Sequence, residues 1–137
     1  MRARDDDGSV LPLVAGYVAL ALALILVCAN ATSLYLAQKR LDASADAAAL
    51  AATEGFVVVP SGGGVGIRLD AERARSQAAD IVALSPDDAR IEALDVTAGG
   101  TARVVVAARW EPFLVAALVP DGVWLSATGT GRTALAG

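Results

Sequence analysis

The stretch from Val10 to Leu36 constrains the fold more than any other part of the sequence. No charged side chain occurs between Asp7 and Lys39, and leucine, alanine and valine dominate the run. The hydrocarbon core of a bilayer is about 30 Å thick, and a helix needs roughly 20 apolar residues to cross it. Because a backbone in hydrocarbon must satisfy its own hydrogen bonds, such a segment is helical. The sequence therefore predicts one transmembrane helix near the N-terminus.

Three interpretations of this apolar stretch remain open. A cleaved secretory signal would fit Ala29-Asn30-Ala31, which forms an A-x-A-like site after the hydrophobic run. The length of the run and the three aspartates at positions 5–7 argue against it, because a signal begins with a basic segment and has a shorter apolar core. The second interpretation is a plain uncleaved anchor, and the third is a leader cut near Gly8.

Small residues recur along one side of the predicted membrane helix. Ala15, Ala19 and Ala23 repeat every four residues, and Gly16 lies beside them. Small side chains at this spacing let two membrane helices approach closely. Alanine is also common in any membrane helix, so two interpretations stay open: a helix-association face, or composition alone.

The helix is expected to continue beyond the membrane as an amphipathic rod. No proline or glycine occurs from Leu34 to Thr53, the run is rich in alanine, and Gly55 is a plausible stop. On the polar side Lys39 lies within reach of Asp42. The apolar stripe of the rod would extend the helix-association face, whose predicted members are Ala15, Gly16, Ala19, Ala23, Leu34, Leu41, Ala45, Ala48 and Ala52.

The remaining residues predict a small head with one helix and an antiparallel sheet. The spacing of apolar residues indicates a helix from Asp70 to Leu84, with Asp70 as its N-cap and Ala74, Ala78, Ile81 and Val82 buried. Alternation indicates a hairpin of residues 91–97 and 101–110, followed by a last strand over residues 122–128.

The register of the hairpin can be predicted from its side chains. A three-residue loop of Ala98, Gly99 and Gly100 places Asp95 opposite Arg103 and Leu94 opposite Val104, so that charge meets charge and apolar meets apolar. The glycine-rich residues 61–66 are expected to form a loop, since they fit no phosphate-binding motif. The apolar residues 113–119, between two prolines, are expected to fold across the core, or else to form an exposed partner patch.

The composition excludes several function classes. The chain has no histidine and a single cysteine, Cys28, so it lacks histidine-dependent catalysis and a zinc site. Its net charge of −4 disfavours nucleic acid. Asp87, Asp88, Glu54 and Ser61 stand in no catalytic context, and the aspartates at positions 5–7 are interpreted as a solvated tail. We predict no catalytic, cofactor-binding or metal site, no enzymatic activity and no small-molecule substrate.

Three segments together resemble the N-terminal region of TadE/TadG-like proteins, which belong to tight-adherence (Flp) pilus-assembly systems. They are Gly-Ser-Val-Leu-Pro-Leu-Val-Ala at 8–15, Leu-Tyr-Leu-Ala-Gln-Lys-Arg-Leu at 34–41 and Ala-Asp-Ala-Ala-Ala-Leu-Ala-Ala at 45–52. The resemblance is strong over residues 8–53 and only general over the head. It implies a minor pilin or pseudopilin with a pilin-like α+β fold. The division is then a polar leader or tail (1–8), a transmembrane and juxtamembrane helix (9–54) and an extracytoplasmic head (55–137).

The resemblance also implies a location, partners and a processing site. The chain would cross the cytoplasmic membrane once, with its N-terminus inside and its head outside, at the cell surface or in a pilus. Its partners would be other pilin-like subunits, the Tad assembly machinery and a prepilin peptidase that cuts between Gly8 and Ser9. TadE-type pseudopilins carry a glutamate five residues after the cut, where this chain has Leu13. TadG-like relatives also lack that glutamate, so a processed and an unprocessed chain both remain open.

Overall fold

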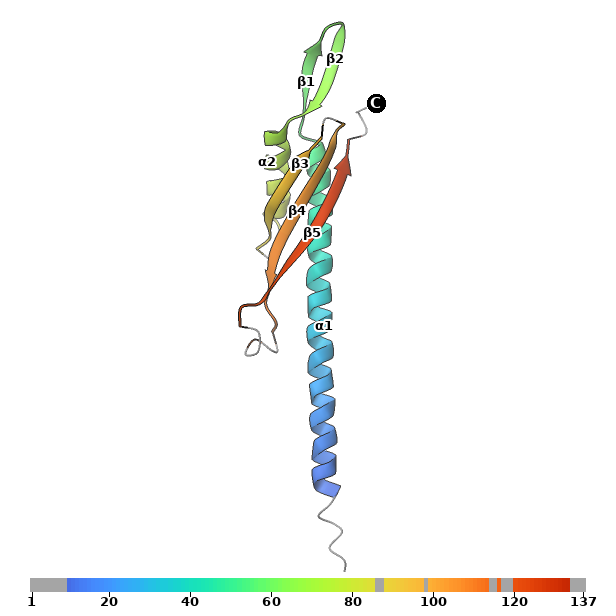
Figure 1. Ribbon diagram of the computed structural model, residues 1–137, viewed down its shortest axis with the longest axis vertical. Coiled ribbons are helices and arrows are strands. Elements are labelled where there is room, and N and C mark those ends of the chain that lie inside the picture. The colour runs from blue at the N-terminus through green and yellow to red at the C-terminus, as the bar shows by residue number, and fades with distance from the viewer. Residues whose placement is uncertain (1–9, 86–87, 98, 114–115, 117–119, 134–137) are drawn as a thin grey trace, which may run out of the picture.

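The computed structural model describes residues 10–85, 88–97, 99–113, 116 and 120–133. One long helix, α1 (Val10–Thr53), runs along most of the long axis of the molecule, and a small head packs along its C-terminal half (Figure 1). The head, residues 55–133, contains a second helix and two antiparallel sheets. The predicted α+β fold with a long apolar N-terminal helix is thereby confirmed.

Helix α1 is continuous from the apolar stretch into the head. Pro12 occupies its first turn, where a proline costs no intrahelical hydrogen bond. Its most apolar window of 18 residues has a mean hydropathy of 2.7, and none of that window is buried by the rest of the described chain. The helix is therefore long and apolar enough to cross a membrane.

The main sheet has the order β3 (Arg90–Val96), β4 (Thr101–Trp110) and β5 (Val123–Arg132), all antiparallel. Asp95 pairs with Arg103 and Leu94 with Val104, so the predicted hairpin register is confirmed. One face of the central strand is buried against the helices, through Ala102, Val104, Val106 and Ala108. This face and the C-terminal half of α1 form the core.

Helix α2 (Ala71–Val82) covers the core beside α1 (Figure 1). The Asp70 carboxylate accepts a hydrogen bond from the Arg73 backbone N–H at 2.9 Å, which confirms the predicted N-cap. Ala74, Ala78 and Val82 are buried as expected. The helix ends before Leu84, whose side chain is 81% exposed, so the predicted C-terminal boundary was two residues too long.

The glycine-rich segment forms a hairpin rather than a loop. Strand β1 (Phe56–Ser61) pairs antiparallel with β2 (Gly64–Leu69), and Gly62 and Gly63 make the turn between them. The prediction of a loop over residues 61–66 was wrong, because the alternation of glycine with Val65 and Ile67 continues a strand that pairs with the valine-rich β1. This hairpin projects from the end of the head farthest from the N-terminus of α1 (Figure 1).

The apolar connection between β4 and β5 is only partly described. Pro112 is fully buried, whereas the side chain of Phe113 is 88% exposed and Ala116 is also exposed. The expectation that this connection folds across the core is therefore wrong for Phe113. Residues 114–115 and 117–119 lie outside the described chain.

Candidate helix-association surface

The N-terminal half of α1 presents its small residues on an open surface. Ala15, Gly16, Ala19 and Ala23 are all exposed. A Cβ atom built on Gly16 would meet no atom within 4 Å outside its own helix. Since no other described element covers these four residues, a second helix can reach them directly.

The C-terminal half of the predicted face is occupied by the chain's own head. Leu41 is 2% exposed, and Ala45, Ala48 and Ala52 are completely buried in the core. Leu34, at the boundary, is half-buried. Of the nine predicted residues, therefore, the four in the apolar half are exposed to another helix, and the alanines of the rod pack against the head.

Two strand glycines let the sheet approach α1 at backbone distance. A Cβ atom on Gly129 would overlap the carbonyl of Ala45, and one on Gly131 would come within 2.6 Å of the carbonyl oxygen of Ala49. The predicted last strand stopped at residue 128, before both glycines, whereas β5 continues through them to Arg132. The two glycines are two positions apart, so they lie on the same face of the strand. This spacing could have indicated a close approach of that face to another backbone.

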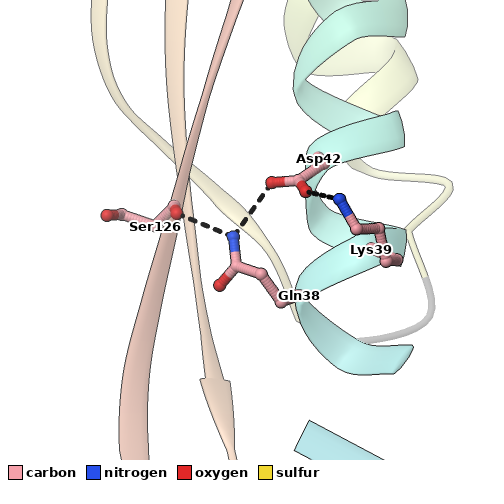
Figure 2. A network of polar contacts seen from close by, with 4 residues as sticks. All are labelled: Gln38, Lys39, Asp42 and Ser126. Atoms are coloured by element: carbon pink, nitrogen blue, oxygen red, sulfur yellow. Dashed lines mark hydrogen bonds and ion pairs between the residues drawn. The ribbon is translucent and has the colours of Figure 1, made fainter. Parts of the chain in front are cut away.

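A polar network joins the sheet to α1 (Figure 2). The amide Nε2 of Gln38 donates to the Asp42 carboxylate at 2.9 Å and to the backbone carbonyl of Ser126 at 3.0 Å. Lys39 forms an ion pair with the same carboxylate at 3.2 Å, which confirms the predicted contact. Gln38 therefore joins a charged helix group to the backbone of β5, and no sequence pattern identified it.

The charges of this network shift each other's titration. The hydrogen bond from Gln38 lowers the pKa of Asp42, and the hydrogen bond and charge of Lys39 add to that effect. The hydrogen bond and charge of Asp42 raise the pKa of Lys39. Asp42 therefore stays ionised to a lower pH, and Lys39 to a higher pH, than an isolated side chain of the same kind.

The residues rejected as catalytic candidates are scattered in the structure. Glu54 is exposed at the end of α1, Ser61 ends β1, and Asp88 is an exposed residue with a φ of 46°. Among the described residues, no group of three or more His, Cys, Asp and Glu side chains could hold a metal ion. Asp87, the aspartates at 5–7 and the predicted processing site at Gly8 and Ser9 lie outside the described residues.

The open helix and its buried continuation lie in one segment that matches a known family. Residues 8–54 match the family model described as putative Flp pilus-assembly TadE/G-like. The chain carries a TadE/G-like segment. The predicted resemblance is thereby confirmed over a span that includes all of α1 and none of the sheets or α2.

The TadE/G-like match supports a role related to Flp pilus assembly, for a membrane-anchored chain. It covers about a third of the sequence, so the head carries no family assignment of its own. No curated protein and no solved structure matches the chain. What the head does therefore has to be argued from its own residues.

Proposed function

We propose that this chain is a non-enzymatic assembly or structural subunit, of the minor pilin or pseudopilin kind, in a Flp/Tad-type pilus or a related secretion system. It acts through association of α1 with other pilin-like helices in the membrane and through contacts of its head. The observation that carries the proposal is the open small-residue surface of α1 inside the TadE/G-like segment. An anchor alone needs an apolar helix, but it does not need small residues on one side of that helix.

The division of the helix supports this mechanism. The rod alanines are committed to the head, so association falls to Ala15, Gly16, Ala19 and Ala23. Within the membrane the hydrophobic effect does not drive helices together. Close van der Waals packing between small residues stabilises their association instead. The head then extends from the same rigid helix and sets how far apart neighbouring subunits stand.

The topology belongs to the same proposal. The chain crosses the cytoplasmic membrane once, with its N-terminus in the cytoplasm and its head outside. The other pilin-like subunits and the Tad assembly machinery are its partners, and a prepilin peptidase that cuts between Gly8 and Ser9 is a further candidate partner. No nucleic acid or small molecule enters this mechanism.

Single substitutions can test the association face against its opposite side. Ala19→Leu adds bulk to the proposed face, while Ala21→Leu adds the same bulk about 200° round the helix. We expect Ala19→Leu to reduce helix association and piliation in the native host, and Ala21→Leu to leave both near wild type. Equal effects of the two variants, or no effect of either, would contradict the proposal.

Cysteine cross-linking gives a second readout that does not depend on piliation. The single native cysteine, Cys28, is exposed and lies about 180° round the helix from Ala19. Leu26→Cys in a Cys28→Ser background places the thiol about 20° from Ala19 instead. We expect the Leu26→Cys chain to form dimers on mild oxidation in native membranes. Ala21→Cys in the same background, about 200° round the helix from Ala19 and away from the sheet, should form far fewer.

A further inference from the structure

Both tryptophans of the chain gather at the end of the sheet that lies nearest the apolar half of α1. Trp110 ends β4, and Trp124 is the second residue of β5. Trp124 is 57% exposed, and Phe113, in the connection between the two strands, is 88% exposed. Figure 1 shows this end of the sheet beside the middle of α1, opposite the β1–β2 hairpin. Half of the six aromatic residues of the chain are therefore found at one exposed end of the head.

A hydrogen bond fixes the height of this end along α1. The indole Nε1 of Trp110 donates to the hydroxyl of Ser33 at 3.3 Å. A hydrocarbon core of roughly 20 helical residues ends near Ala29 if it begins at Val10, and near Ser33 if it is centred between Asp7 and Lys39. Both placements put Trp110 at the boundary between acyl chains and headgroups, which is where tryptophan is enriched in membrane proteins.

A groove between the sheet and α1 continues from this point into the apolar segment. It has a volume of about 910 Å³. Its walls are mainly apolar and include Leu24, Ile25 and Cys28 of α1 and Trp110 and Leu125 of the sheet. Leu24 lies nine positions before Ser33, or about 13 Å further into the membrane. The groove therefore opens at a depth where only acyl chains are present.

Arginines surround the aromatic residues and the groove. Arg40 and Arg109 contribute to the groove walls, and the guanidinium of Arg90 lies 4.4 Å from the centre of a Trp124 ring. Arg109 and Arg90 each approach a glutamate, Glu111 and Glu92, at the long distance of 3.7 Å. A guanidinium has five N–H donors, so both keep donors for lipid phosphate.

We propose that this end of the head is seated in the headgroup layer of the leaflet that α1 leaves, and that a phospholipid acyl chain fills the groove. The inference rests on α1 crossing a membrane, as in the proposed function. It adds a second attachment, because the sheet as well as the helix contacts lipid. The head then lies against the bilayer and does not swing freely above it.

Tryptophan quenching can test this in the full-length chain. The Trp110→Phe variant leaves Trp124 as the single tryptophan, and the wild-type chain, which keeps the hydrogen bond from Trp110 to Ser33, is measured beside it. In vesicles of phosphatidylcholine brominated near the carbonyl end of its acyl chains, we expect Trp124 to lose about half of its emission, because interfacial tryptophans lie at headgroup level. Lipid brominated near the methyl end should quench it clearly less.

Two reporter variants separate failure of the inference from failure of the anchor. With both native tryptophans changed to Phe, Tyr17→Trp reports on α1 within the membrane, and Val58→Trp reports on the distal hairpin. We expect strong quenching of Tyr17→Trp and none of Val58→Trp. If Tyr17→Trp is quenched while neither Trp124 alone nor the wild-type pair of tryptophans is, the inference is wrong and the anchor stands. If neither is quenched, the membrane-spanning helix and the inference both fail.

A charge placed at the contact provides a matched comparison. Phe113→Asp should at least halve the quenching of Trp124, whereas Leu84→Asp should leave it unchanged. Leu84 is 81% exposed and precedes Ser85, whose hydroxyl accepts from Ser44. That contact is about 16 Å further along α1 than Ser33, well above the headgroups. Equal effects of the two variants would overturn the inference. It would also be overturned if Trp124 emission changed with protein concentration and not with brominated lipid, because protein would then cover this end of the head.

Discussion

Gly129 of β5 lies against the carbonyl of Ala45 in α1, with no room between them for a methyl group. The contact joins the last strand of the sheet to the helix at the centre of the core, where Ala45 is completely buried. Helix and strand are therefore held at backbone distance by two residues with almost no side chain.

We expect Gly129→Ala to destabilise the head by about 1–3 kcal/mol, because the added methyl must displace helix backbone and not a flexible side chain. Gly64→Ala, in strand β2, is the matched control, since a Cβ atom there meets nothing within 4 Å. Urea unfolding followed by tryptophan emission measures both. A Gly129→Ala chain as stable as the Gly64→Ala chain would show that the sheet does not pack this closely on α1.

Acid should loosen the contact between α1 and β5 through Asp42. The pKa of Asp42 is lowered by its hydrogen bond from Gln38, so its stabilising contribution is present above the usual aspartate pKa and is lost as the pH falls through the lowered value. The effect is less than about 1 kcal/mol, because the group is partly exposed and water screens it.

Thermal unfolding of Asp42→Asn between neutral and acid pH measures that effect. We expect the unfolding temperature of Asp42→Asn to fall less between neutral and acid pH than that of the wild-type chain. Asp46→Asn, on an exposed position of the same helix, should leave that dependence in place. Identical acid profiles for Asp42→Asn and the wild type would count against the network.

The N-cap of α2 gives a further test of the head. Asp70→Ala removes the acceptor of the Arg73 backbone N–H and should cost about 1 kcal/mol of unfolding free energy. Asp80→Ala changes an exposed aspartate inside the same helix, so it controls for the loss of charge. A difference of at least a few tenths of a kcal/mol between the two variants in urea unfolding is the expected result.

Replacing the apolar helix as a whole separates a pilus subunit from a generic membrane-anchored binding module. Residues 10–29 can be exchanged for an unrelated membrane helix of equal length that lacks the small-residue face. We expect the exchanged chain to reach the membrane and to fold, but to fail in association and piliation. Full piliation with the foreign helix would support the generic module instead.

The native N-terminus decides between the three interpretations of the apolar stretch. Helix α1 runs unbroken through Ala29 and Thr32, and the Thr32 hydroxyl donates to the carbonyl of Cys28 at 2.9 Å. We expect the intact mass of the protein extracted from its native membrane to include these residues. A start at Ser9 would indicate pilin-type processing, and a start at or near Met1 a permanent anchor. A start at Thr32 would contradict the membrane-spanning helix.

The helices and the β3–β4 register could be predicted because local signals agreed with the tertiary packing. The Asp70 cap, the alanine spacing of α2 and the Asp95–Arg103 pair each depend on residues close in sequence. The β1–β2 hairpin was missed because its glycines masked the alternation of the second strand. The partner of the rod alanines could not be read from the helix alone, since an alanine stripe packs equally well on a second helix or on a glycine-containing strand.

The unbroken course of α1 has a mechanical consequence. Helix α1 has no break between its exposed apolar half and the half that packs against the sheet. A rotation of the helix about its own axis in the membrane must therefore turn the head through the same angle. In the proposed association, the side of α1 that a neighbouring subunit contacts would also determine which side of the head it meets, so the helix contact would set the orientation of the whole subunit.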